Sequence, residues 1–227
     1  MRSAFMLLSA ALLLLEPRAG FAQEPPSDSP FGGFTWTFGG GLAAPVFDSS
    51  KRFPLGGQFD VALGYRLLDR LAVQVDYLYS TYGVSADVLQ GGSFNASHTV
   101  QAGNLNFLLS VLPRSSSVEL YVLGGPGVYG RTVEVSSVSG EPVPSLCEPG
   151  LLLCFSSVAP FPTTLAKATE IGFGLDAGLG MSISLGIPVR LFLETRFHFI
   201  WGTIDTPDGP RKANGQYVPV SIGFRYF

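Results

Sequence analysis

Charged residues occupy alternate positions in several otherwise apolar segments of this chain. They are Asp60, Arg66, Asp76, Glu119, Glu170, Asp176, Arg190, Glu194, Arg196 and Arg225. Carboxylates and guanidinium groups that share an enclosed space form ion pairs, because an unpaired buried ion is strongly unfavourable. The pattern therefore predicts a buried charge network wherever these faces meet. The alternative is a gated path for ions through the same side chains.

A second possible chemistry is nucleophilic catalysis by Ser, His and an acid, as in enzymes that modify membrane lipids. His198 is the only histidine within a predicted strand, and its phase turns it toward the polar face. Its neighbours Phe197, Phe199 and Ile200 offer no nucleophile. We predict that His198 is an interior residue, that no residue is catalytic and that the protein is not an enzyme. His98, at the edge of a loop, is expected to be solvated.

The cysteines and histidines are too few for an obvious metal-ligand set, and no glycine-rich phosphate loop is present, so we expect no metal and no cofactor. Cys147 and Cys154 flank a short segment that contains Pro149 and Gly150. In an exported protein, two cysteines this close usually form a disulfide. Redox or zinc sites need other spacings, and we predict a disulfide between these two cysteines.

The first residues predict export from the cytoplasm. Arg2 gives a positive start, residues 4–15 form an apolar run, and residues 19–22 end in small side chains. This is the pattern of a secretory signal peptide. The apolar run is shorter than the roughly 20 residues of a spanning helix. We expect a cleaved signal peptide at 1–22, a flexible lead-in at 23–32 and one domain at 33–227.

The segments that must position the charged residues alternate apolar and polar side chains with a period of two, which is the signal of β-strands. They lie near 33–44, 58–66, 71–80, 104–109, 118–123, 170–181, 190–199 and 218–226. Most are about ten residues, the length of a tilted strand that crosses a bilayer. Pro126 and Pro219 lack a backbone donor, so we expect both at strand ends.

The connections alternate in length along the chain. Those after the second, fourth and sixth segments are short, whereas the others span about 45–54, 83–98, 132–167 and 202–216. This alternation is typical of periplasmic turns and extracellular loops. All three lysines, Lys51, Lys167 and Lys212, then fall in or beside outer loops.

Alternation alone does not say which face is outside. A soluble lipocalin-like barrel would place apolar residues inside and charge outside. Here the polar face consists of small residues and charges of both signs, which suits a narrow lumen, and the apolar face carries no charge. Tyr77, Tyr79 and Tyr82 at the outer ends, with Trp36 and Tyr65 at the inner ends, predict interfacial girdles of aromatic residues.

We therefore predict an all-β fold: a closed, antiparallel, eight-stranded transmembrane β-barrel with up-and-down meander connections. The interior of an eight-stranded barrel is just wide enough for side chains. The charged residues are thus expected to plug the lumen.

Several runs resemble the family of small bacterial outer-membrane β-barrel domains, of the OmpA and OmpX type. They are residues 120–125, 172–180, 190–197 and 220–227. The resemblance implies residence in the bacterial outer membrane and assembly by the barrel-insertion machinery, with Phe224, Tyr226 and Phe227 as the assembly signal. Phe227 is out of phase with the other two. Family members stabilise membranes, adhere to surfaces or form narrow pores.

The expected role is that of an integral outer-membrane protein with a structural or surface-interaction function. The alternative is a narrow porin-like channel for ions or small solutes.

The net charge of −3 and the lack of a basic run argue against nucleic acid as a partner. Expected partners are outer-membrane lipids, the insertion machinery and an extracellular ligand of the long third loop, which places residues 151–153 and Phe155 beside the cysteines. The alternative is a loop that caps the barrel mouth. The chain is expected to be a monomer.

Overall fold

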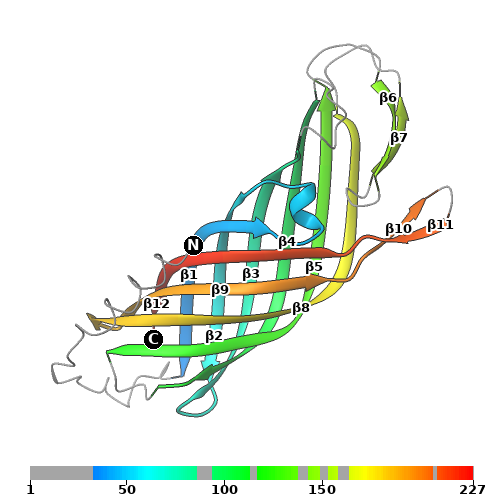
Figure 1. Cartoon of the computed structure of the whole chain (residues 1–227). Helices are drawn as coiled ribbons and strands as arrows, with labels where there is room; N and C mark the ends of the chain where they lie inside the picture. Colours follow the sequence, from blue (N-terminus) through cyan, green and yellow to red (C-terminus); the bar gives the residue numbers. More distant parts are fainter. Residues whose placement is uncertain are drawn as a thin grey trace, which may run out of the picture.

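The segments of alternating polarity are strands of one closed antiparallel sheet in the computed structural model (Figure 1). The structure describes residues 33–85, 94–112, 117–137, 143–148, 153–157, 164–206 and 209–226. The barrel strands are β1 (Phe34–Pro45), β2 (Gly56–Arg66), β3 (Leu71–Gly83), β4 (Phe94–Ser110), β5 (Val118–Ser137), β8 (Thr164–Ile187), β9 (Val189–Ile200) and β12 (Gly215–Tyr226).

Every barrel strand pairs with its neighbours in the chain, and β12 pairs with β1 to close the sheet. In this closing pair Trp36 lies opposite Tyr226 and Leu42 lies opposite Val220. Closure pairs the two strands that would otherwise be sheet edges. The predicted fold class, a closed eight-stranded antiparallel barrel, is confirmed.

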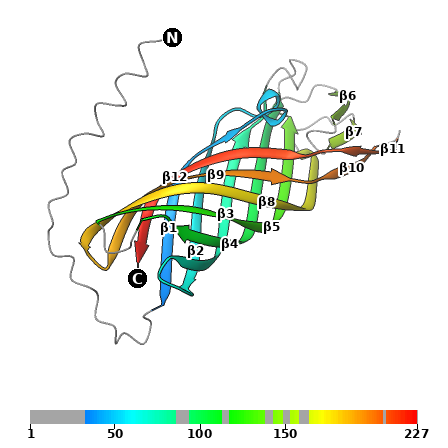
Figure 2. The same ribbon diagram turned by 60° about the horizontal axis from the view of Figure 1, so that its bottom comes forward.

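The two ends of the barrel differ. One end, here called the turn end, carries the connections after β2, β4 and β8. The other, the loop end, carries the 3-10 helix η2 (Ser49–Lys51) and the hairpins β6 (Val143–Glu148) with β7 (Leu153–Ser157) and β10 (Thr203–Thr206) with β11 (Gly209–Lys212). Figure 2 shows both hairpins beyond the barrel wall at this end. Lys51, Lys167 and Lys212 all belong to the loop end.

Strands β4, β5 and β8 are longer than predicted, with 17, 20 and 24 residues. They rise past the other strands at the loop end (Figure 1). Residues 94–98, 132–137 and 164–167, which we expected to be loop, are therefore strand. Their inward positions include the apolar Val133 and Val135 as well as His98, but outward positions such as Ser97, Thr132 and Lys167 are polar. Because the outward positions are no longer apolar, the alternation that predicts a strand is lost, and the sequence predicted loops here.

Both prolines lie inside strands, so the expectation of strand ends was wrong. Pro126 is within β5 and Pro219 is within β12. The β4–β5 pairing is interrupted opposite Leu105 and Asn106, and the β12–β9 pairing is interrupted at Pro219 and the residue before it. Thr195 Oγ1 donates a hydrogen bond of 3.2 Å to the Pro219 carbonyl. A missing donor is tolerated where the ladder already opens.

The outward face is apolar on all eight strands, as predicted. One half-exposed residue from each strand illustrates it: Phe38, Phe59, Val75, Leu105, Val122, Leu179, Leu193 and Ile222. Trp36, Tyr65 and Tyr226 are exposed at the turn end, and Tyr77 and Trp201 nearer the loop end. Tyr82 differs from the prediction, because it points inward and is buried.

The predicted signal peptide at 1–22, the lead-in at 23–32, Leu151, Leu152 and Phe227 lie outside the described residues. Within the described part of the chain, no helix is long and apolar enough to span a membrane. The β6–β7 register sets Cys147 directly opposite Cys154. The disulfide between them stays a prediction.

Candidate functional site

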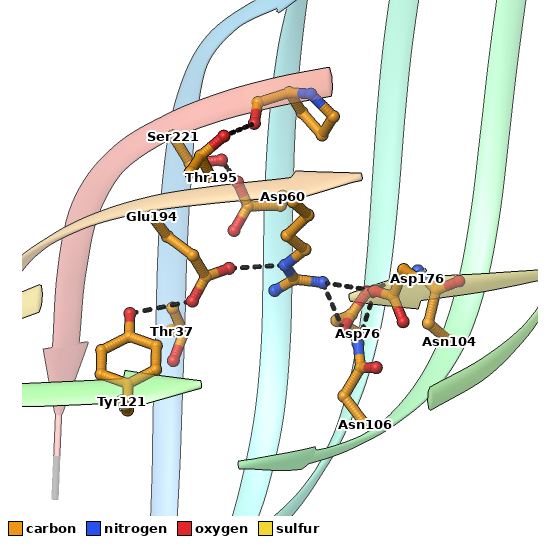
Figure 3. Close-up of polar contacts among 12 residues, drawn as sticks. Thr37, Asp60, Asp76, Asn104, Asn106, Tyr121, Asp176, Glu194, Thr195 and Ser221 are labelled. Atoms are coloured by element: carbon orange, nitrogen blue, oxygen red, sulfur yellow. Dashed lines mark hydrogen bonds and ion pairs between the residues drawn. The ribbon is translucent and has the colours of Figure 1, made fainter. Parts of the chain in front are cut away.

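The centre of the barrel lumen holds one guanidinium among three carboxylates. Arg196, on β9, places Nη1 2.9 Å from Asp76 Oδ1 and 3.5 Å from Asp176 Oδ2, and its Nε lies 2.5 Å from Glu194 Oε1. The acids come from β3, β8 and β9, and all four side chains are buried. Figure 3 shows the three carboxylates around this guanidinium. A guanidinium with its fork of donors suits such a bridge between several acids.

Two asparagines complete the hydrogen bonding of these acids. Asn104 Nδ2 donates to Asp76 Oδ2 at 2.8 Å, and Asn106 Nδ2 donates to Asp76 Oδ1 at 2.7 Å and to Asp176 Oδ2 at 3.0 Å. The Gly125 amide donates to Asp176 Oδ1 at 3.0 Å. Both asparagines occupy alternate positions in the strand predicted at 104–109, but the predicted charge network did not include them. Only the pairing of β3 with β4, which sets Asp76 opposite Asn104, reveals their role.

Arg225 and Tyr121 extend the cluster toward the turn end. The Tyr121 hydroxyl donates to Glu194 Oε2 at 2.8 Å and accepts a bond of 3.3 Å from Arg225 Nη2. The Arg225 guanidinium lies 4.7 Å from the centre of the Tyr121 ring and 3.8 Å, measured from Nη2, from Glu194. The ring and the acid both favour the cation at this position.

Three further predicted residues lie close to this cluster without joining its central bridge. Asp60 Oδ1 accepts a bond of 2.8 Å from Ser221 Oγ, which in turn accepts a bond from Gln58. Nearer the turn end, Glu119 lies 3.6 Å from Arg190 Nη1 and accepts hydrogen bonds from two serine hydroxyls, Ser110 and Ser182. The interior thus contains ion pairs and hydrogen-bonded acids at several levels along the barrel axis.

Glu170 is apart from the others, at the loop end. It pairs with Arg131, and its Oε1 accepts a bond of 2.8 Å from the Thr203 amide. Arg131 was missed because the predicted strand ended at 123. Arg66, the remaining predicted residue, is half-buried at the opposite end and makes no ion pair with any described residue.

The lumen changes character toward the loop end, where it is aromatic. Phe53, from the first outer connection, stacks on His98 with ring centres 4.2 Å apart, and Tyr82 and Tyr217 pack against the same histidine. His98 Nε2 and the Tyr217 hydroxyl are hydrogen bonded at 2.9 Å. The expectation that His98 is solvated was wrong, because β4 is longer than predicted and the first connection folds Phe53 inward.

His198 points inward and is buried, as predicted. Its Nδ1 lies 2.9 Å from the Tyr129 hydroxyl. In the described ranges, no group of three or more His, Cys, Asp or Glu side chains could hold a metal ion. At the surface of the loop end, Lys51 donates a hydrogen bond of 2.9 Å to Asp48 Oδ1. That bond and the nearby positive charge lower the pKa of the Asp48 carboxyl.

No protein-family model matches the sequence, and no curated protein matches it. Solved structures of similar fold include two crystal structures of outer-membrane proteins. A major outer membrane protein from Thermus thermophilus aligns with a TM-score of 0.54 at 12% identity, over 86% of this chain and 98% of that chain. The outer membrane protein OprG from Pseudomonas aeruginosa aligns with a TM-score of 0.50 at 14% identity, over 86% and 95%. The chain thus has the fold of small outer-membrane β-barrel proteins.

Proposed function

We propose that this chain is an integral protein of the bacterial outer membrane with a structural or surface-interaction role, and that its lumen is closed by its own side chains. The proposal has no catalytic step. The closed lumen is inferred from one observation, the central bridge of Arg196 with Asp76, Asp176 and Glu194 across the barrel interior.

The outward face supports placement in a membrane. Half-exposed apolar side chains surround the whole barrel, and contiguous apolar patches of this extent are rare on soluble monomers. On β8 the band runs from Ile187 near the turn end to Ile171, and the outward residues beyond it are Thr169 and Lys167. The upper parts of β4, β5 and β8 would then stand in water outside the cell, and the turn end would face the periplasm.

Two features favour a lumen that is closed to ions and argue against a narrow channel. An ion that crosses the centre must separate Arg196 from its acids, which leaves buried charges without compensation. At the loop end it must also displace the stacked Phe53 and His98 rings. The interior of an eight-stranded barrel leaves little other room.

The proposal is tested by two measurements on the exported protein. On gels in dodecyl sulfate, the unboiled outer-membrane fraction is expected to migrate differently from the boiled chain, because a compact barrel resists the detergent. In planar bilayers, the purified barrel is expected to show no discrete conductance steps. Regular single-channel steps would contradict the closed lumen, and a soluble periplasmic protein would contradict the membrane placement.

The third outer connection is our candidate contact surface for an extracellular partner. It contains the β6–β7 hairpin, in which Cys147 lies opposite Cys154. We propose that a disulfide here makes the hairpin rigid, and closing so short a loop contributes roughly 2 kcal/mol to its local stability. The alternative, a loop that folds back over the barrel mouth, predicts that hairpin variants alter barrel stability.

The cysteine pair is tested by the variant that carries both Cys147→Ser and Cys154→Ser. We expect proteolysis within the third connection to become faster, because a hairpin without the disulfide opens more often. The urea midpoint of the barrel should stay unchanged. Thiol labelling of the denatured, unreduced wild-type chain should find no free thiol. Labelling of both cysteines would refute the disulfide, and a lowered midpoint would favour the capping alternative.

The end of β12 supports assembly by the barrel-insertion machinery. Phe224 and Tyr226 are half-exposed on the outward face of β12, where this strand closes the sheet against β1. We propose that these two aromatic residues, with Phe227, form the assembly signal.

A further inference from the structure

A cleft at the turn end of the barrel contains hydrogen-bond donors that have no acceptor among the described residues. Its walls come from β1, β2, β3, β4, β5 and β12, with Thr35, Gly64, Arg66, Gln74 and Arg225 among the lining residues. None of these side chains is part of the Arg196 bridge in the centre of the lumen.

Gln74 is the clearest indication of a ligand. Its side chain is only 3% exposed, yet Nε2 has no hydrogen-bond acceptor among the described residues. The Nε of Arg66, which lines the same cleft, is also buried and without an acceptor. Buried donors are nearly always satisfied in native proteins, so two orphans in one cleft point to a missing acceptor.

The charges around the cleft favour an anion as that acceptor. The lining contains three arginines, Arg66, Arg70 and Arg225, against two acids, Asp69 and Glu119. Glu119 is already held by two serine hydroxyls and lies 3.6 Å from Arg190. Arg225 lies 3.8 Å from Glu194, so Arg66 and Arg70 remain opposite a single acid, Asp69. Arg66 has no carboxylate within ion-pair distance in the described chain, so an anion in the cleft would supply a direct counter-charge.

The wall beside these donors is kept open by a glycine. A Cβ atom at Gly64 would collide with Thr35 Oγ1. Any side chain at this position would therefore press on the Thr35 hydroxyl and narrow the cleft. This hydroxyl is a third polar group that lines the same space as Arg66 and Gln74.

We infer that this cleft is a binding site for a phosphate group, with Arg66 Nε and Gln74 Nε2 as donors to its oxygens. Guanidinium and amide donors match the oxygens of such an anion, and charge-assisted bonds of this kind are short and strong. The inference goes beyond the proposed function and uses it only to say that the cleft opens to the periplasm. Binding itself is measured on the isolated barrel, so its failure would leave the membrane placement intact.

The test is a titration of the full-length barrel with inorganic phosphate, in a detergent without phosphate and at constant ionic strength. We expect the urea midpoint to rise with phosphate and to saturate, as mass action requires for a ligand of the folded state. Arg66→Gln is expected to weaken the apparent affinity by about tenfold or more, because a charge-assisted bond is lost. Gln74→Met, which keeps the shape and removes the donor, should also weaken it. Arg211→Gln, at the loop end, removes the same charge and should respond like wild type.

A second arm separates the two sources of phosphate. Barrels in phosphatidylcholine vesicles are compared with barrels in vesicles that contain phosphatidic acid, whose terminal phosphate is accessible. A response to this lipid that Arg66→Gln abolishes, without a response to free phosphate, would assign the site to a lipid headgroup. If neither form raises the midpoint, or if Arg66→Gln and Arg211→Gln respond alike, the inference is wrong.

Discussion

Replacing Arg196 with methionine is expected to lower the free energy of unfolding of the barrel by about 3–5 kcal/mol. The substitution removes the guanidinium that lies 2.9 Å from Asp76 and 2.5 Å from Glu194. It leaves Asp76 and Asp176 buried without a counter-charge, and Glu194 keeps only Arg225, 3.8 Å away. Urea unfolding in detergent, followed by the mobility shift on gels and by tryptophan fluorescence, measures the loss.

Two controls make this result specific to the bridge. Arg211→Met removes an exposed arginine on the β10–β11 hairpin and should change stability by less than about 0.5 kcal/mol. Adding Asp76→Asn to the Arg196→Met variant removes one of the buried carboxylates that lost its counter-charge. The double variant should therefore regain part of the lost free energy of unfolding. Wild-type stability in the Arg196→Met variant would show that the central cluster does not hold the lumen together.

Replacing Leu179 with arginine is expected to destabilise the barrel by about 2–4 kcal/mol in lipid vesicles. Leu179 is 62% exposed on the outward face of β8, midway between Ile171 and Ile187. In the proposed orientation it therefore faces the middle of the bilayer, where an arginine cannot keep its hydration. The measurement is reversible urea unfolding in vesicles.

The matched control is Ser97→Arg, an outward position on the part of β4 that rises above the apolar band. Because this position should lie in water, the same arginine there should cost less than about 1 kcal/mol. Equal effects at the two positions would argue that the apolar face is not in contact with lipid, and would favour a soluble barrel.

The alternation of residue types was enough to predict the number of barrel strands and the direction of their side chains. On β8, residues 170–181 read as an apolar face against glycines and acids, and the structure places Leu179 outside and Asp176 inside. This works because a strand turns successive side chains to opposite faces, so the face of each residue is a local property.

The ends of β4, β5 and β8 could not be predicted in the same way. Beyond the apolar band their outward positions are polar. Only a few inward positions are then left to alternate with them, so the period-two pattern that predicts a strand is weak. Arg131, the residue that pairs with Glu170, lies in one of these extensions. The burial of His98 was also hidden, because its covering ring, Phe53, belongs to a connection with no periodic pattern.

The partners within the lumen were decided by the tertiary structure alone. Asp76 and Arg196 are 120 residues apart in the chain and meet only because the sheet closes. Which inward residues share a layer depends on the register and tilt of all eight strands, and each one-residue slip would exchange the faces of a strand. The sequence therefore determines that charges face the lumen, whereas closure of the barrel determines which charges touch. Closure also leaves Arg66 Nε and Gln74 Nε2 at the turn end without an acceptor in the described part of the chain.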